Sequence, residues 1–189
     1  MTGETGREGN FALRLCKWNE LTGPELKLTA AIVQVTTPDG IAHARTLLQE
    51  YARALDFDLC FQSFDAELAN LPGEYAPPSG RLLLAYIKDE PAGSIALHAI
   101  PDASQPEKTI CEMKRLYVRP KFRGHDLGRQ LIDRVLSEAR AIGYTHMRLD
   151  TISGTMDRAI ALYRAYGFYE IPPYRPNPQP GVLYFELAL

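Results

Sequence analysis

The sequence predicts an α/β domain built on a mixed sheet, and three observations carry that prediction. Six short segments have the apolar content of β-strands, and four others repeat apolar residues at the spacing of an α-helix. The two kinds of segment are interleaved along the chain, as in domains whose helices pack on the faces of a sheet. With 189 residues and 46% hydrophobic content, the chain is long enough to bury one sizeable core.

The first expected elements are a strand and two helices. AAIVQV (30–35) is strand-like, and the turn sequence TPDG ends it. From Ile41 to Leu55 the apolar positions recur at helical spacing. FDAELANL (64–71) is a second, shorter helical stretch, which Pro72-Gly73 ends.

Three strand-like runs come next. RLLLAYI (81–87) and GSIALHAI (93–100) are joined by KDEPA, a short turn-rich link that favours an antiparallel hairpin. CEMKRLYV (111–118) is the third run. Pro120 marks a boundary after it, because the residue before a proline is pushed out of helical conformation.

The last third of the chain alternates helices and strands. The segment 127–142 has one apolar helical face, and Gly143 provides a stop of the C-cap type. HMRLDTI (146–152) is a strand, MDRAIALYRAYGF (156–168) is a helix, and VLYFELAL (182–189) is the closing strand. These elements complete a sheet with about four helices.

Composition limits the class of protein. Lys and Arg number 21 against 23 Asp and Glu, so no overall basic field is available to attract nucleic acid or an anionic membrane. The three cysteines lie far apart without a CxxC pair, which indicates neither a disulfide framework nor a metal site. No apolar run is long enough to span a membrane, and the N-terminus lacks the hydrophobic core of a secretory signal. A cytoplasmic location is the default expectation.

Residues 1–28 are expected to form an N-terminal tail or arm, and residues 29–189 the folded domain. The first segment carries four glycines and mixed charge without a sustained period. Its apolar residues available to dock on the domain are Phe11, Leu13, Leu15 and Trp18.

Residues 119–132, RPKFRGHDLGRQLI, form a glycine-bearing turn that opens into a helix. Unpaired N–H groups and the helix dipole make such a helix start favourable for anions. Between residues 114 and 129 there are six basic residues and one acid, Asp126, once Glu112 is left outside the window. Gly124 and Gly128 let a phosphate approach the backbone closely. Taken alone, the stretch is more often explained as turn punctuation with a solvated basic face, and it contains neither GxxxxGK[ST] nor GxGxxG.

A combination of segments resembles the GNAT superfamily of acyl-coenzyme A transferases. Its signature is Arg/Gln-x-x-Gly-x-Gly/Ala after a V-x-P strand end, followed further on by A-x-x-L-Y-x-x-x-G-F. This chain has LYVRPKFRGHDLGRQLI and AIALYRAYGF, and its segments 111–118 and 167–178 are similar to bacterial-type members. The resemblance covers about residues 30–189. It implies six to seven strands, in which the strand ending at Val118 splays from the parallel strand 146–152 and acetyl-CoA lies in the gap.

The resemblance also implies which residues bind the cofactor. The pyrophosphate of acetyl-CoA would lie on the loop and the pantetheine arm on the strand end before it. The loop residues are Arg123, Gly124, His125, Asp126, Leu127 and Gly128, and the strand residues are Leu116, Tyr117 and Val118. Two positions depart from the pattern, since Asp126 replaces the middle glycine and Met156 replaces an asparagine common at the start of the later helix.

The resemblance suggests two catalytic residues. An amine with a pKa near 10.4 is neutral only about once in two thousand molecules at pH 7, so help with deprotonation matters. Glu112, on the strand before the loop, is the candidate base, and a buried ion pair is the alternative explanation for it. Tyr163 resembles the acid that protonates the departing thiolate, and plain core packing is the alternative.

The expected activity is direct transfer of an acetyl group from acetyl-CoA to a primary amine of a small molecule, peptide or protein, without a metal. The alternative is a GNAT-fold module that binds acyl-CoA or regulates without turnover. Tyr174 and Asn177 are weaker candidates for contacting the acceptor, since turn chemistry alone explains an Asn-Pro pair. A homodimer is retained as a candidate assembly, and the identity of the acceptor is left open.

The acid in FRGHDLG leads to a specific prediction. A carboxylate about 6 Å from a phosphate charge is repelled by roughly 1–3 kcal/mol, which neighbouring cations would offset. Asp is also a favoured N-cap, so Asp126 is expected to turn its side chain to the N–H of Gly128 or Arg129 and away from the cofactor. Replacing Asp126 by glycine should then tighten CoA binding.

Overall fold

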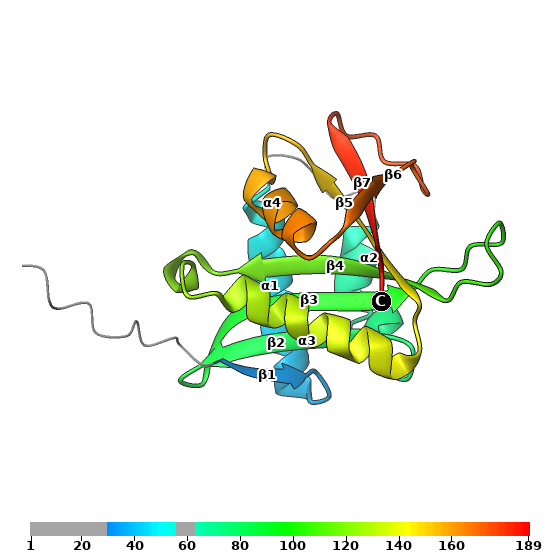
Figure 1. The fold of residues 1–189 in the computed structure, drawn as a ribbon. Coiled ribbons are helices and arrows are strands. Elements are labelled where there is room, and N and C mark those ends of the chain that lie inside the picture. Colours follow the sequence, from blue (N-terminus) through cyan, green and yellow to red (C-terminus); the bar gives the residue numbers. More distant parts are fainter. Residues whose placement is uncertain (1–29, 56–62) are drawn as a thin grey trace, which may run out of the picture.

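The computed structural model describes residues 30–55 and 63–189. The predicted arm over residues 1–28 lies outside the described residues, as do Cys16 and Cys60. In the part that is described, the strand and helix order agrees with an α/β domain, and Figure 1 shows helices on both faces of one sheet.

Seven strands form a single mixed sheet in the order β1-β2-β3-β4-β5-β7-β6. All neighbours are antiparallel except β4 and β5, which run parallel. The predicted mixed sheet is therefore confirmed. The strands are β1 (Ala31–Gln34), β2 (Arg81–Ile87), β3 (Glu90–Ala99), β4 (Ile110–Val118), β5 (His146–Ile152), β6 (Tyr169–Ile171) and β7 (Val182–Ala188).

Within residues 30–55 and 63–189, four α-helices cover the sheet, together with two short 3-10 turns, η2 (Gly73–Tyr75) and η3 (Pro120–Phe122). The helix α3 packs on one face of β2, β3 and β4, and α1 packs on the other face (Figure 1). Alternate residues of β2 serve the two cores: Leu83 faces the α3 side and Leu84 the α1 side. The helices are α1 (Pro38–Arg53), α2 (Phe64–Ala69), α3 (Leu127–Ile142) and α4 (Asp157–Ala165).

Several elements differ from the sequence prediction, and three of the differences have a clear local reason. TPDG begins α1, because the Thr37 hydroxyl caps the Gly40 N–H at 3.1 Å and proline is favoured in a first turn. Only Lys88 and Asp89 form the hairpin turn, with φ of 49° and 63°, so β3 already starts at Glu90. The strand β6 was not predicted, since its three residues are too short for a periodic signal.

The parallel pair β4 and β5 is joined over only part of its length. The register pairs Ile110 with His146, Cys111 with Met147 and Glu112 with Arg148, and no residue of β4 after Glu112 pairs with β5. Strand β5 nevertheless continues to Ile152 and stays paired with β7 along its whole length. The two parallel strands therefore separate beyond Glu112, as the family resemblance implies, and leave a gap in the middle of the sheet.

A bulge interrupts β4 inside this gap. Lys114 lies opposite Ala96 and Tyr117 opposite Ser94, so β4 carries one more residue than β3 at this point. The extra residue is Arg115, whose φ of 61° is left-handed. The Arg115 guanidinium is buried and forms two hydrogen bonds with the Glu67 carboxylate, which ties the bulge to α2.

Candidate active site

A groove of about 840 Å³ runs between the loop before α3 and the helix α4. It combines apolar walls with a backbone-rich end at the start of α3. Its lining includes Leu116 and Val118 of β4, Arg123, Gly124, Asp126, Leu127, Gly128 and Arg129 at the α3 end, and Met156, Ala159 and Leu162 on the α4 side. Most of the predicted cofactor residues are therefore brought together along one groove.

Two predicted cofactor residues are not part of the groove lining. Tyr117 points to the other core, where its ring makes an edge contact with Tyr51 at 6.2 Å between centroids. His125 also does not line the groove, although both of its neighbours do. Arg123 folds back toward the strand, and its Nε donates a hydrogen bond of 3.0 Å to the Val118 carbonyl.

The start of α3 presents backbone donors to the groove. The first intrahelical bond is from the Gln130 N–H to the Asp126 carbonyl, at 3.0 Å, so the three preceding N–H groups come before the helical ladder. A Cβ built on Gly124 would meet nothing within 4 Å, and one on Gly128 would meet only Leu162, at 3.9 Å. The space above both glycines is open, which fits a pyrophosphate held by the helix start.

The predicted capping role of Asp126 is wrong. The residue is the N-cap of α3, but its side chain makes no capping hydrogen bond. Its backbone is left-handed, with φ of 56° and ψ of 12°, whereas capping side chains are normally placed by an extended N-cap residue. The carboxylate is therefore held at the rim of the groove instead of being tied to the helix donors.

A small cavity of about 70 Å³, here called the acetyl cavity, lies where β4 and β5 separate. It shares Leu116, Met156 and Ala159 with the groove, so the two spaces lie side by side. The remaining lining residues are Tyr51, Met113, Lys114, Arg115, Leu149, Asp150, Thr151 and Tyr163. The groove thus leads from the α3 start into the gap between the parallel strands.

Tyr163 reaches this cavity from α4. Its side chain is buried, and its ring packs against Phe168 in an edge contact with centroids 5.8 Å apart. Burial raises the pKa of the Tyr163 phenol, and the neighbouring Tyr51 and Asp150 raise it further. Tyr163 therefore packs in the core and also lines the cavity, and its role as the acid stays a prediction.

Glu112 is 1% exposed and lies among paired groups. Tyr174 donates to its Oε1 at 2.6 Å and His98 to its Oε2 at 2.9 Å, while Arg175 Nη2 lies 3.0 Å from Oε1. Burial raises the pKa of this carboxyl, but the His98 hydrogen bond, the Lys114 and Arg175 charges and the Tyr174 hydrogen bond outweigh it and hold the pKa at about 2. This geometry agrees with the ion-pair alternative, and the role of Glu112 as a base stays a prediction.

The proline-rich loop between β6 and β7 is fixed over the gap. Arg175 Nη2 donates to Asp150 Oδ1 and Asn177 Nδ2 to Asp150 Oδ2, both at 2.8 Å. The Tyr184 hydroxyl donates to the Arg175 carbonyl at 2.9 Å. Tyr174 and Asn177 are thus held near the separated strands through Glu112 and Asp150. Asp150, which lies in the strand HMRLDTI, was not predicted as a site residue.

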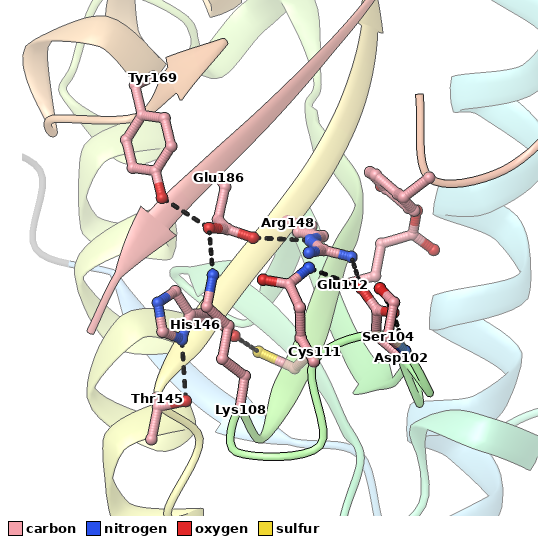
Figure 2. A network of polar contacts seen from close by, with 12 residues as sticks. Asp102, Ser104, Lys108, Cys111, Glu112, Thr145, His146, Arg148, Tyr169 and Glu186 are labelled. Carbon is pink, nitrogen blue, oxygen red and sulfur yellow. Dashed lines mark hydrogen bonds and ion pairs between the residues drawn. The ribbon is translucent and has the colours of Figure 1, made fainter. Parts of the chain in front are cut away.

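A second charged network, shown in Figure 2, lies where β4 and β5 are still paired. The Arg148 guanidinium bonds Glu186 at 2.7 Å and Asp102 at 2.9 Å, and Glu186 also accepts from Lys108 at 3.1 Å and from Tyr169 at 2.6 Å (Figure 2). Each of these charges has an opposite charge beside it. The network therefore holds β4 and β5 together at their paired end, and the cavity lies at the end where the two strands separate.

The remaining reactive groups do not add chemistry to this site. Burial raises the pKa of the Cys111 thiol to about 12, so it stays protonated and a poor nucleophile at neutral pH. Within residues 30–55 and 63–189, no group of three or more His, Cys, Asp and Glu side chains could hold a metal ion. Over the same ranges, no helix has the length and apolar content needed to cross a membrane.

Comparison with known proteins points to one family. The model of the acetyltransferase (GNAT) family matches residues 43–168. An uncharacterized N-acetyltransferase of Schizosaccharomyces pombe is 38% identical over 159 residues, which cover 84% of this chain and 94% of the relative.

Solved structures share the fold. An acetyltransferase from Streptococcus agalactiae has a TM-score of 0.67 at 24% identity, over 85% of this chain and 98% of that chain. A GNAT family acetyltransferase from Elizabethkingia anophelis, solved with acetyl-CoA bound, has a TM-score of 0.56 at 21% identity, over 85% of this chain and 98% of its own.

Proposed function

Because the chain belongs to the GNAT acetyltransferase family, we propose that it transfers an acetyl group from acetyl-CoA directly to a primary amine of a small molecule, peptide or protein. One observation carries the proposal: the groove at the α3 start lies beside the acetyl cavity and shares three lining residues with it, and Tyr163 lines that cavity. A ligand with a polyphosphate, a long arm and a small acyl end matches that path.

The cofactor half of the proposal rests on the start of α3. The N–H groups of Leu127, Gly128 and Arg129, with the helix dipole behind them, would hold the pyrophosphate. The apolar side chains of Leu116 and Val118 line the path of the arm, along the edge of β4 that β5 no longer covers. Acetyl-CoA supplies the thioester carbonyl that the amine attacks.

Tyr163 is proposed as the acid for the leaving thiol. A thiolate in water has a conjugate pKa near 8.5, so a proton donor at its position favours its departure. The raised pKa keeps the Tyr163 phenol protonated throughout the neutral range, so it can donate a hydrogen bond to the developing thiolate. Its contact with Phe168 fixes the ring, so the hydroxyl is positioned without further ordering.

Glu112 enters the proposal in two forms. As the predicted base it would have to release one of its partners, since a carboxylate with a pKa of about 2 is a weak proton acceptor. As a positioning residue it holds Tyr174 and Arg175 over the strand gap. The contacts favour the second form.

The test is release of free CoA from acetyl-CoA with a panel of primary amines. The Tyr163→Phe variant should lower kcat by about 10²–10⁴-fold with little change in CoA affinity. Tyr144→Phe is the matched control, because that hydroxyl bonds the Ser79 carbonyl away from the groove. Unchanged turnover in Tyr163→Phe would remove the acid role.

The runner-up function, an acyl-CoA-binding or regulatory module, is favoured by Asp126 at the groove rim. Calorimetric titration separates it from the enzyme. Micromolar CoA binding with no turnover of any amine would support the module, and no binding at millimolar CoA would exclude both functions.

A further inference from the structure

The Lys114 ammonium is the least satisfied cation near the acetyl cavity. Its side chain is 10% exposed, and its nearest carboxylate oxygen, Glu112 Oε2, lies 3.8 Å away, beyond hydrogen-bond distance. Among residues 30–55 and 63–189 it donates no hydrogen bond, although an ammonium has three donors. Burial lowers the pKa of Lys114, and the negative charge of Glu112 offsets part of this effect.

The neighbouring cations are better paired. Arg115 makes two hydrogen bonds to the Glu67 carboxylate, and Arg175 Nη2 lies within 3.0 Å of both Glu112 and Asp150. Glu112 accepts from Tyr174 and His98, whereas Lys114 stays beyond hydrogen-bond distance of its Oε2. A half-buried ammonium without a hydrogen bond, close to an Arg175 Nε that also has no partner among the described residues, indicates that a ligand supplies the missing acceptor.

Lys114 stands where two cavities meet. It lines the acetyl cavity, and it also lines a groove of about 340 Å³ beside α2 and η2, here called the α2 groove. That volume is at the lower end of the range for small-molecule sites. The other residues of the α2 groove are Ser63, Ala66, Glu67, Asn70, Pro72, Gly73, Glu74 and Tyr75. A small acceptor lying in the α2 groove would reach the thioester by passing the Lys114 ammonium.

We infer that the acceptor is a small amine that also carries a carboxylate, as an α-amino acid does, and that Lys114 binds this carboxylate. The inference rests on the proposed function and names its substrate class. Asp150, which lines the acetyl cavity from β5, supplies the complementary charge. Each of its oxygens accepts one hydrogen bond and keeps lone pairs for the incoming ammonium. A cation on β4 and an anion on β5 therefore match a zwitterion across the strand gap.

The experiment compares three forms of each acceptor: the L-α-amino acids, their carboxamides, and the amines that lack the carboxyl group. In the wild-type protein, kcat/KM for the preferred acid should exceed that of its amide by about tenfold or more, as expected for a charge-assisted hydrogen bond. Lys114→Gln should remove this preference, mainly through KM. Lys108→Gln is the matched control, because Lys108 pairs with Glu186 outside both cavities.

A binding measurement separates this inference from the proposed function. Thermal stabilisation of the CoA-loaded protein by amino acids, but not by their amides, would support the carboxylate site even if no amine were acetylated. Equal kcat/KM for acids and amides, or a preference that survives in Lys114→Gln, would overturn the inference while leaving the acetyltransferase intact. Acetylation confined to peptides or proteins with no nearby carboxylate would overturn it as well.

Discussion

The replacement of Asp126 by glycine tests the cofactor site most directly. The residue lies at the rim of the groove, at the start of α3, and its backbone has a φ of 56°. The substitution removes a negative charge beside the proposed pyrophosphate position. It also places the residue type with the least left-handed strain at a left-handed position.

The expected magnitude follows from the separation of the charges. A carboxylate and a phosphate charge about 6 Å apart repel by roughly 1–3 kcal/mol for effective dielectric constants between those of water and a protein surface. That energy corresponds to about a 5- to 150-fold change in the dissociation constant. Arg123 and Arg129 also line the groove and offset part of the repulsion, so we expect CoA to bind about fivefold more tightly to Asp126→Gly.

The assay is calorimetric titration with CoA at about 20 mM and 200 mM salt. The gain in affinity should shrink at the higher salt concentration, because screening weakens the repulsion. Asp89→Gly is the matched control, since Asp89 is also left-handed, with φ of 63°, and does not line the groove. Weaker CoA binding in Asp126→Gly, with the control unchanged, would refute the electrostatic reasoning and show that the carboxylate helps to hold the cofactor.

Three further predictions concern the groove, a buried acid and the bulge. Gly128→Ala should weaken CoA binding with no loss of thermal stability, whereas Gly93→Ala should lower the melting temperature, because its Cβ would lie 2.6 Å from a carbonyl oxygen of β4. Glu112 has a lowered folded-state pKa of about 2, so its stabilisation is present above the unfolded pKa near 4.3 and is lost as the pH falls toward 2. In Glu112→Gln, urea unfolding at pH 2–7 should lack that pH-dependent part, on the order of 3 kcal/mol, and an unchanged pH dependence would contradict the pKa. Glu67→Ala leaves the buried Arg115 guanidinium unpaired and should cost about 3–5 kcal/mol in urea unfolding at pH 7, and a loss below 1 kcal/mol would contradict the pairing.

The elements with strong local signals could be predicted from the sequence. The helix α3 occupies residues 127–142 as predicted, because its apolar face is continuous and Gly143 takes the left-handed conformation, with φ of 101°, that ends it. The short strand β6 was missed because pairing with β7, and not its own three residues, makes it a strand. The start of α1 was predicted at Ile41, but the helix begins at Pro38. TPDG resembles a turn, whereas Thr37 acts as the N-cap of the helix.

The candidate site was predictable only where a motif marks it. Gly124 and Gly128 lie in a recognisable signature, and the groove brings them together with the α4 residues of the second motif. Lys114 and Asp150 belong to no such motif. They stand out only through their partial burial and through hydrogen-bonding capacity that their neighbours leave unused. The burial and pairing of these two side chains depend on where β4 and β5 separate, and the sequence of either strand alone does not predict that point.

The extra residue in β4 determines which face of the sheet, and so which cavity, the side chains on either side of it reach. In an unbroken strand, side chains two apart share a face, so Lys114 and Leu116 would point the same way. With Arg115 inserted between them, Lys114 lines the α2 groove, while Leu116 packs with the α3 core and lines the groove between the α3 start and α4. A deletion of one residue here would turn each later side chain of β4 to the opposite face of the sheet. Under the proposed function, substitutions before the bulge alter the acceptor side of β4 and leave the residues of the donor groove in place, so acceptor specificity can diverge in this strand while donor binding is kept.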